Sequence, residues 1–182
     1  MRKELDEKLV ADYPELYRDR FGDMRKTLMC WGFDCGDGWY QIIDTLSYAL
    51  TLSHRNAKQD VEFWTKHLGQ TVWNNRIGTQ EDIDRATKRL EETPCPVARQ
   101  VKEKVGTLRF YVDRATERQY NYIEFAELMS SKTCEECGAS GQTYYIGWNR
   151  TLCDKHADEA YGEEAADYRN KTGVWADDEE KF

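Results

Sequence analysis

The sequence lacks long hydrophobic runs and any excess of positive charge. No stretch of its 182 residues approaches the roughly 18 consecutive apolar residues that a membrane-spanning helix requires. The N-terminal segment MRKELDEKLV has no apolar core of the kind found in secretion signals. The formal net charge of −8 argues against a surface that attracts phosphate backbones as a whole, although it leaves room for a local basic patch. We therefore expect a cytoplasmic protein without membrane contact.

Internal repeats, low-complexity segments and linkers are also missing. With 33% charged and 40% hydrophobic residues, the composition is that of a globular protein, and the length suits one domain with or without a small appendage. Histidine is scarce, with three residues, whereas there are six cysteines. In a reducing compartment, cysteines serve more often as metal ligands, core residues or catalytic thiols than as disulfides.

Apolar periodicity predicts a helical N-terminal portion. Residues 4–20 indicate two helical pieces, with Pro14 in the first turn of the second. An amphipathic helix is expected from Trp39, with a break near Asn56. Asp37 lies where the N-cap of that helix would be.

Strand patterns follow the helical portion. Thr79 and Thr116 each begin a pattern typical of a helix N-terminus. Between these helices, residues 107–112 alternate apolar and polar side chains and predict a strand. We expect an antiparallel hairpin that turns at Val105 and Gly106.

Two pairs of metal-ligand residues lie near the C-terminus. Cys134 and Cys137 form a CxxC pair, and Cys153 and His156 repeat the two-residue spacing. Zinc takes four such ligands tetrahedrally, and Gly138 permits the tight turn that aims two sulfurs at one point. Three cysteines and one histidine complete the coordination shell, so we expect one structural Zn²⁺.

The segment between the two pairs predicts a short hairpin, and the second pair falls in the first turn of a helix. A knuckle, a hairpin and a helix in this order are typical of a treble-clef-like zinc element. The predicted fold class is therefore α+β. We expect a helical/α+β body over residues 1–130, the zinc element over 131–165 packed on that body, and an acidic tail over 166–182.

The stretch CWGFDCGDGW, residues 30–39, is the second unusual motif. We interpret it as a structured loop that buries Trp31 and Phe33. Three alternatives remain open. Its two cysteines could bind a second metal ion, a thiol could act with His54 as its base, or Asp34 and Asp37 could hold Mg²⁺ in a metal-dependent hydrolase.

If this loop faces the strand hairpin and the turn at residues 147–150, a pocket with aromatic walls and cationic groups results. Such a pocket would suit a nucleotide or an acidic peptide. The alternative without a ligand is that the aromatic residues belong to the hydrophobic core and the basic residues face solvent. The candidate ligand-binding residues are Trp31, Asp34, Asp37, Trp39, Lys102, Lys104, Arg109, Trp148 and Arg150.

Two groups of motifs resemble a family of small proteins of uncharacterised function carried by tailed bacteriophages and prophages. The first is YPELYRDRFGDM with MCWGFDCGDGWYQIIDTL, and the second is VKEKVGTLRFY with TCEECGASG and GWNRTLCDKHA. The resemblance covers the N-terminal third and residues from about 97 to 160, and residues 51–93 have no counterpart in it. It implies an accessory protein made in the cytoplasm of the bacterial host, where such proteins commonly redirect host machinery or counter host defence.

Three function hypotheses follow. The first is a non-enzymatic zinc-containing phage accessory protein that binds a host or viral protein. The second is a nucleotide-binding or nucleic-acid-binding protein that uses the basic and aromatic pocket. The third is the metal-dependent hydrolase.

Overall fold

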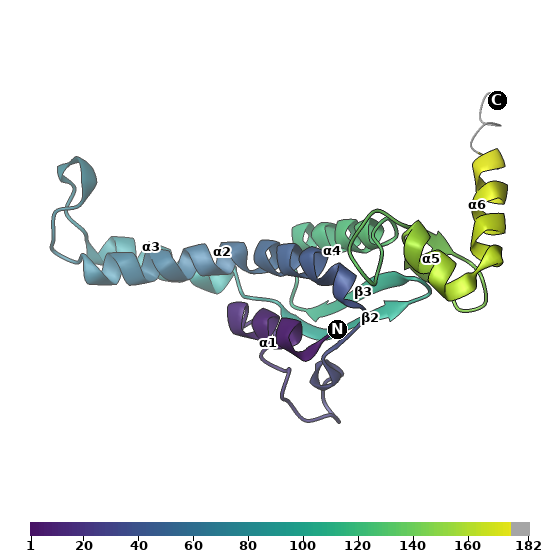
Figure 1. Cartoon of the computed structure of the whole chain (residues 1–182). Helices are drawn as coiled ribbons and strands as arrows, with labels where there is room; N and C mark the ends of the chain where they lie inside the picture. Colours follow the sequence, from purple (N-terminus) through teal and green to yellow (C-terminus); the bar gives the residue numbers. More distant parts are fainter. Residues whose placement is uncertain (176–182) are drawn as a thin grey trace.

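A computed structural model describes residues 1–175 of the protein and has the predicted α+β class. Figure 1 shows the elements along the chain. The helices are α1 (Lys3–Asp12), α2 (Tyr40–Lys66), α3 (Gln80–Glu92), α4 (Glu117–Ser130), α5 (Asp154–Tyr161) and α6 (Glu163–Trp175). The strands are β1 (Phe33–Asp34), β2 (Val97–Lys104), β3 (Thr107–Asp113), β4 (Gln142–Tyr144) and β5 (Arg150–Leu152).

Three helix predictions are wrong in detail. The second helical piece after Pro14 is a series of turns. The expected break near Asn56 is absent, since α2 runs through this exposed residue as one helix of 27 residues. Asp37 makes no cap bond and instead begins a short 3₁₀ turn, Asp37–Trp39, because its carboxylate accepts hydrogen bonds from Arg2.

The starts of α3 and α4 are confirmed. The Thr79 side chain accepts a hydrogen bond from the backbone N–H of Asp82, and Thr116 does the same for Gln119. In both helices the third residue returns a bond to the cap backbone, which completes the capping box. These local bonds set where each helix begins.

The main sheet has the strand order β1-β2-β3. The β2–β3 hairpin is antiparallel and turns at Val105 and Gly106, as predicted. Sequence patterns did not indicate β1, a two-residue strand that pairs parallel to β2 and places Asp34 opposite Lys102. The parallel pairing brings the CWGFDCGDGW loop to the edge of the hairpin.

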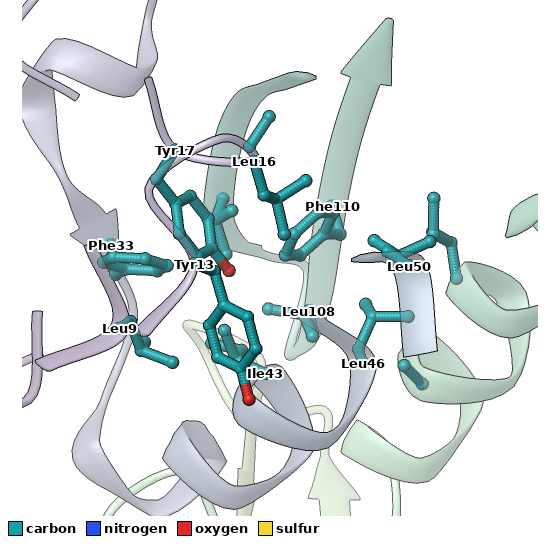
Figure 2. Close-up of a cluster of buried hydrophobic side chains, with 14 of the residues drawn as sticks. Leu9, Tyr13, Leu16, Tyr17, Phe33, Ile43, Leu46, Leu50, Leu108 and Phe110 are labelled. Carbon is teal, nitrogen blue, oxygen red and sulfur yellow. The ribbon is translucent and has the colours of Figure 1, made fainter. Parts of the chain in front are cut away.

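The main hydrophobic core joins α1, the segment that follows it, α2, the hairpin and α4. Figure 2 shows aromatic side chains at its centre, where the Tyr17 ring meets Phe33 edge-on at 5.0 Å and Phe110 at 6.4 Å. Leu108 and Phe110, the apolar face of β3, are buried in this cluster. The alternating pattern thus places the correct face of the strand inward.

A second, smaller core lies in the C-terminal element. Tyr144, Leu152 and Ala157 are fully buried there with Ala165. Tyr168 of α6 packs on Tyr144 at 5.2 Å between ring centroids. Residues 166–175 therefore belong to helix α6, which packs on the C-terminal element, whereas the sequence predicts a tail from residue 166. Residues 176–182 of that tail lie outside the described part.

Helices α2 and α3 form an arm that projects from the body (Figure 1). At 1.5 Å rise per residue, α2 is about 40 Å long, and its last fully buried residue is Ala57. Beyond that point α2 packs against α3, and the loop between the two helices forms the far end of the molecule. The C-terminal element with α5 and α6 lies at the opposite end.

Candidate metal centre

The four predicted ligands converge on one point. The Sγ atoms of Cys137 and Cys153 are 3.8 Å apart, and Nδ1 of His156 is 3.3 Å from the Sγ of Cys134 and 3.4 Å from that of Cys153. All four ligand atoms lie within 4.8 Å of one another. The cluster could bind one metal ion, and no other group of three or more His, Cys, Asp or Glu side chains gathers within residues 1–175.

Local backbone geometry aims the first pair of ligands. The chain turns tightly after Cys134, where the N–H of Gly138 donates to the Cys134 carbonyl at 2.9 Å. Gly138 has a φ of +77°, a left-handed conformation that glycine adopts without steric cost. The N–H of Cys134 donates to the carbonyl of Ala139 at 2.8 Å. The knuckle, which we define as residues 134–138, is thus closed by its own backbone.

The second pair comes from the start of α5. Cys153 is the N-cap residue of that helix, and His156 lies in its first turn. The backbone N–H groups of His156 and Lys155 lower the pKa of Cys153, since they stabilise the thiolate. Burial raises the pKa of Cys134. A bound cation would offset that cost by stabilising the deprotonated sulfur.

The knuckle docks on the CWGFDCGDGW loop. The N–H of Gly38 donates to the backbone carbonyl of Glu135 at 2.7 Å, and the N–H of Gly36 donates to its carboxylate at 2.9 Å. The indole N–H of Trp39 donates to the carbonyl of Thr133 at 2.8 Å. The two unusual motifs are therefore the two sides of one contact.

Two of the three glycines of the loop, Gly36 and Gly38, are required by that contact. A Cβ on Gly38 would lie 2.2 Å from the carbonyl oxygen of Cys134, and one on Gly36 would lie 2.3 Å from that of Glu135. Both obstacles are backbone atoms, which cannot rotate away as a side chain can. Residues 36–38, which we call the socket, accept the knuckle only without side chains at these two positions.

The two tryptophans of the loop are placed differently from one another. Trp39 is fully buried beside the socket, so it cannot form the wall of a ligand pocket. Trp31, which we expected to be buried, is 66% exposed, whereas Phe33 is buried as predicted. The short 3₁₀ turn Met29–Trp31 buries Met29 and leaves Trp31 facing solvent.

The cysteines of the loop do not form a second metal site with other ligand side chains in the described residues. Cys30 donates its thiol hydrogen to the carbonyl of Thr27 at 3.1 Å. Burial raises the pKa of Cys35 to about 12 and that of Cys95 to about 11, which keeps both as thiols at neutral pH. His54 binds Glu15 and the Thr93 carbonyl. The thiol pKa values and these His54 bonds argue against a catalytic thiol.

The structure brings together part of the predicted ligand pocket. Asp34, Lys102 and Arg109 occupy one row across the three strands. Lys102 and Lys104 also line a groove of about 460 Å³ together with Trp148, which is 74% exposed. This groove is the part of the predicted pocket that exists.

Three of the predicted pocket residues, Arg109, Arg150 and Asp37, already bind other protein groups through ion pairs or backbone hydrogen bonds. Arg109 donates to the carbonyl of Leu108, and Arg150 pairs with Glu136. Asp37 accepts a hydrogen bond of 2.7 Å from the N–H of Arg2 and pairs with its guanidinium. Because the Asp37 carboxylate is already bound by Arg2, it is not available to bind Mg²⁺ together with Asp34.

Comparison of the chain with protein-family models, with curated proteins and with solved structures gives no match. No helix within the described residues has the length and apolarity to cross a membrane.

Proposed function

We propose that the metal is one structural Zn²⁺ in a treble-clef-like element. A tetrahedron with zinc–sulfur bonds of about 2.3 Å and a zinc–nitrogen bond of about 2.0 Å has edges of about 3.8 Å between sulfurs and about 3.5 Å between sulfur and nitrogen. Three of the six separations, 3.8 Å between two sulfurs and 3.3–3.4 Å between sulfur and nitrogen, come close to these edges, and all six lie within 4.8 Å. Thiolate and imidazole ligands also suit zinc better than magnesium or calcium.

Four protein ligands leave no coordination position for a substrate, which supports a structural role for the metal rather than a catalytic one. The knuckle that the metal would hold also makes the docking contact with the socket. A bound zinc ion would thus stabilise both the C-terminal element and its attachment to the body.

Elemental analysis of freshly purified protein tests this assignment. We expect one zinc per chain in the wild type and none in Cys153→Ala. Cys30→Ala removes a thiol that belongs to no metal-ligand cluster of the described residues and serves as the matched control, with zinc content unchanged. A different metal, or full zinc retention in Cys153→Ala, would contradict the proposal.

The proposed function is that of a non-enzymatic accessory protein of a tailed bacteriophage or prophage, acting in the bacterial cytoplasm on a host or viral protein. The observation that carries the binding role is the projecting α2–α3 arm, whose end exposes large apolar side chains. The phage context rests on the motif resemblance described above. Redirection of host machinery or of host defence is the activity that this context favours.

Affinity capture from a bacterial lysate tests the binding role. The full chain is immobilised, and the lysate is applied with and without nuclease treatment. We expect a specific protein to be retained under both conditions. A partner that is lost after nuclease treatment would indicate that retention depended on nucleic acid, and no retained protein at all would contradict the binding role.

The groove beside Trp148 favours a second candidate function, the binding of a nucleotide or nucleic acid. Lys102 and Lys104 supply cations for phosphates, and the exposed indole offers a surface on which a base could stack. Mass spectrometry of co-purified small molecules tests this candidate. A retained nucleotide that is lost in Trp148→Ala would support it, and purified protein free of nucleotide and unable to bind single-stranded DNA would exclude it.

A further inference from the structure

The end of the arm is a short, ordered finger. The loop between α2 and α3 doubles back on itself, with a bridge between Thr71 and Ile77 and a hydrogen bond of 2.8 Å from the N–H of Val72 to the carbonyl of Arg76. At its apex Asn74 and Asn75 both have a φ of 58°, a left-handed conformation that asparagine tolerates better than most residues. We define the tip as residues 66–79.

Aromatic stacking holds the tip in place on α2. The ring of Trp73 stacks on Phe63 at 5.0 Å with an interplanar angle of 30°, and it lies 5.9 Å from the ring of Trp64. The guanidinium of Arg76 lies 4.8 Å above Trp64. Trp73 is therefore fixed before any partner arrives, so binding would not have to order it.

Despite this support, the tip exposes its apolar side chains. Leu68 is 49%, Trp73 59% and Ile77 56% exposed. An exposed tryptophan with aliphatic neighbours on a rigid projection has the composition of an energetic anchor in a protein interface.

The tip is also free of negative charge. Residues 63–80 contain no Asp or Glu, although the whole chain carries a net charge of −8. Lys66 and Arg76 are the lysine and arginine residues of this segment. The tip thus carries positive charge whereas the chain as a whole is acidic, which favours a partner surface that carries negative charge.

We propose that the tip recognises an apolar cleft with an acidic rim on the partner protein, with Trp73, Leu68 and Ile77 entering the cleft. This inference rests on the proposed binding role and names its surface. A protein is favoured over a nucleic acid because the Arg76 guanidinium already pairs with Asp82 and stacks on Trp64. Among the lysine and arginine side chains of residues 63–80, only that of Lys66 then remains to contact a phosphate. Affinity for a nucleic acid requires several phosphate contacts.

Site-specific photo-crosslinking in a bacterial lysate tests the proposal. A photoreactive phenylalanine replaces Leu68 in the full chain, and a second protein carries it at Tyr145, which is 65% exposed in the C-terminal element at the opposite end. We expect position 68 to crosslink to a protein, through a peptide rich in Asp and Glu. Trp73→Ala in the same chain should lower the yield about thirtyfold, as for an interface anchor, and Lys66→Glu about tenfold.

Matched variants make the result specific. Trp31→Ala removes a tryptophan of similar exposure, 66%, in the CWGFDCGDGW loop and should leave the yield unchanged. Phe125→Ser alters the apolar groove between α2 and α4 and should also leave it unchanged. Circular dichroism of each variant shows that the helices are retained.

Four outcomes would overturn the assignment. These are crosslinks from position 68 to nucleic acid, crosslinks to a second copy of the chain, a yield that Phe125→Ser lowers and Trp73→Ala does not, and crosslinks from position 145 alone. A protein crosslinked at position 145 alone would leave the binding role standing and remove the tip from it. Absence of any protein crosslink at both positions would contradict the binding role as well.

Discussion

The backbone N–H of Gly38 donates a 2.7 Å hydrogen bond to the backbone carbonyl of Glu135, which joins the start of α2 to the knuckle. The neighbouring Gly36 bonds the carboxylate of the same residue at 2.9 Å. Through these bonds, a loop from the first quarter of the chain contacts the knuckle that carries two of the four candidate metal ligands.

The first prediction concerns the fit of this contact. In Gly38→Ala the new methyl group would lie 2.2 Å from the Cys134 carbonyl oxygen and 2.5 Å from the Gly138 nitrogen, so the knuckle must move away. We expect the free energy of unfolding to fall by about 3 kcal/mol, as for overpacking against atoms that cannot yield. Chemical denaturation measures this change.

Gly147→Ala is the matched control for that variant. Gly147 has a φ of +60° and no atom near the position of a new Cβ, so the substitution adds backbone strain alone and should cost only about 1 kcal/mol. Equal losses in the two variants would mean that the close approach of knuckle and socket does not determine the stability of the contact.

The second prediction concerns removal of the metal. The C-terminal core has few buried side chains of its own, and a structural zinc site supplies folding free energy to such a small unit. Treatment with a chelator should therefore increase amide hydrogen exchange across β4, β5 and α5, while the body core around Tyr17 and Phe110 keeps its protection. Unchanged exchange in the C-terminal element after complete metal removal would contradict this role.

The third prediction concerns strain in the β2–β3 turn. Val105 has a φ of 55°, and a β-branched residue in the left-handed region is strained. Because asparagine followed by glycine is favoured in a two-residue hairpin turn, Val105→Asn should raise the free energy of unfolding by about 1 kcal/mol. Thermal unfolding measures the change. Val105→Ala, which removes the branch but not the left-handed strain, should gain less, and a destabilised Val105→Asn would be inconsistent with strain at this position.

The fourth prediction concerns pH and the arm. Hydrogen bonds from Thr79 lower the pKa of Asp82, and Arg76 adds to the effect. A carboxylate with a lowered pKa in the folded state stabilises it above its ordinary titration range, and this contribution is lost as the pH falls through the folded-state pKa. Asp82→Asn should therefore destabilise α3 at neutral pH and make no difference in strong acid.

Hydrogen exchange in α3 as a function of pH measures this dependence. The control is Asp84→Asn in the same helix, because the Asp84 carboxylate forms no ion pair within the described residues. This substitution should change the exchange rates in α3 much less at neutral pH. A pH-independent difference between wild type and Asp82→Asn would assign the effect of the substitution to lost hydrogen-bond geometry instead of charge.

Features that depend on neighbours along the chain could be predicted from the sequence. The cluster of four candidate metal ligands follows from two short spacings, and the starts of α3 and α4 follow from capping residues three positions apart. The turn at Val105 and Gly106 follows from alternation in the strand after it. In each case the interacting groups lie within a few residues of one another.

Features that depend on distant partners could not be predicted in this way. Asp37 looked like a helix cap, but Arg2 binds its carboxylate. Trp31 and Trp39 are chemically alike, but Trp39 is buried in the main core with its indole N–H on the Thr133 carbonyl, whereas Trp31 is exposed. The glycines of the socket carried a signal, their density in a ten-residue stretch, but their close contact with residues 134–138 is visible only in three dimensions.

The close fit between socket and knuckle has a consequence for inheritance. A gene that kept CWGFDCGDGW and lost the CxxC turn would leave two glycine amides and the Trp39 indole N–H without acceptors on a newly uncovered face. A protein that kept the CxxC turn alone would lack the two glycines that let the knuckle approach the backbone of the loop. We therefore expect the two motifs to be kept or lost together among sequences that descend from this one.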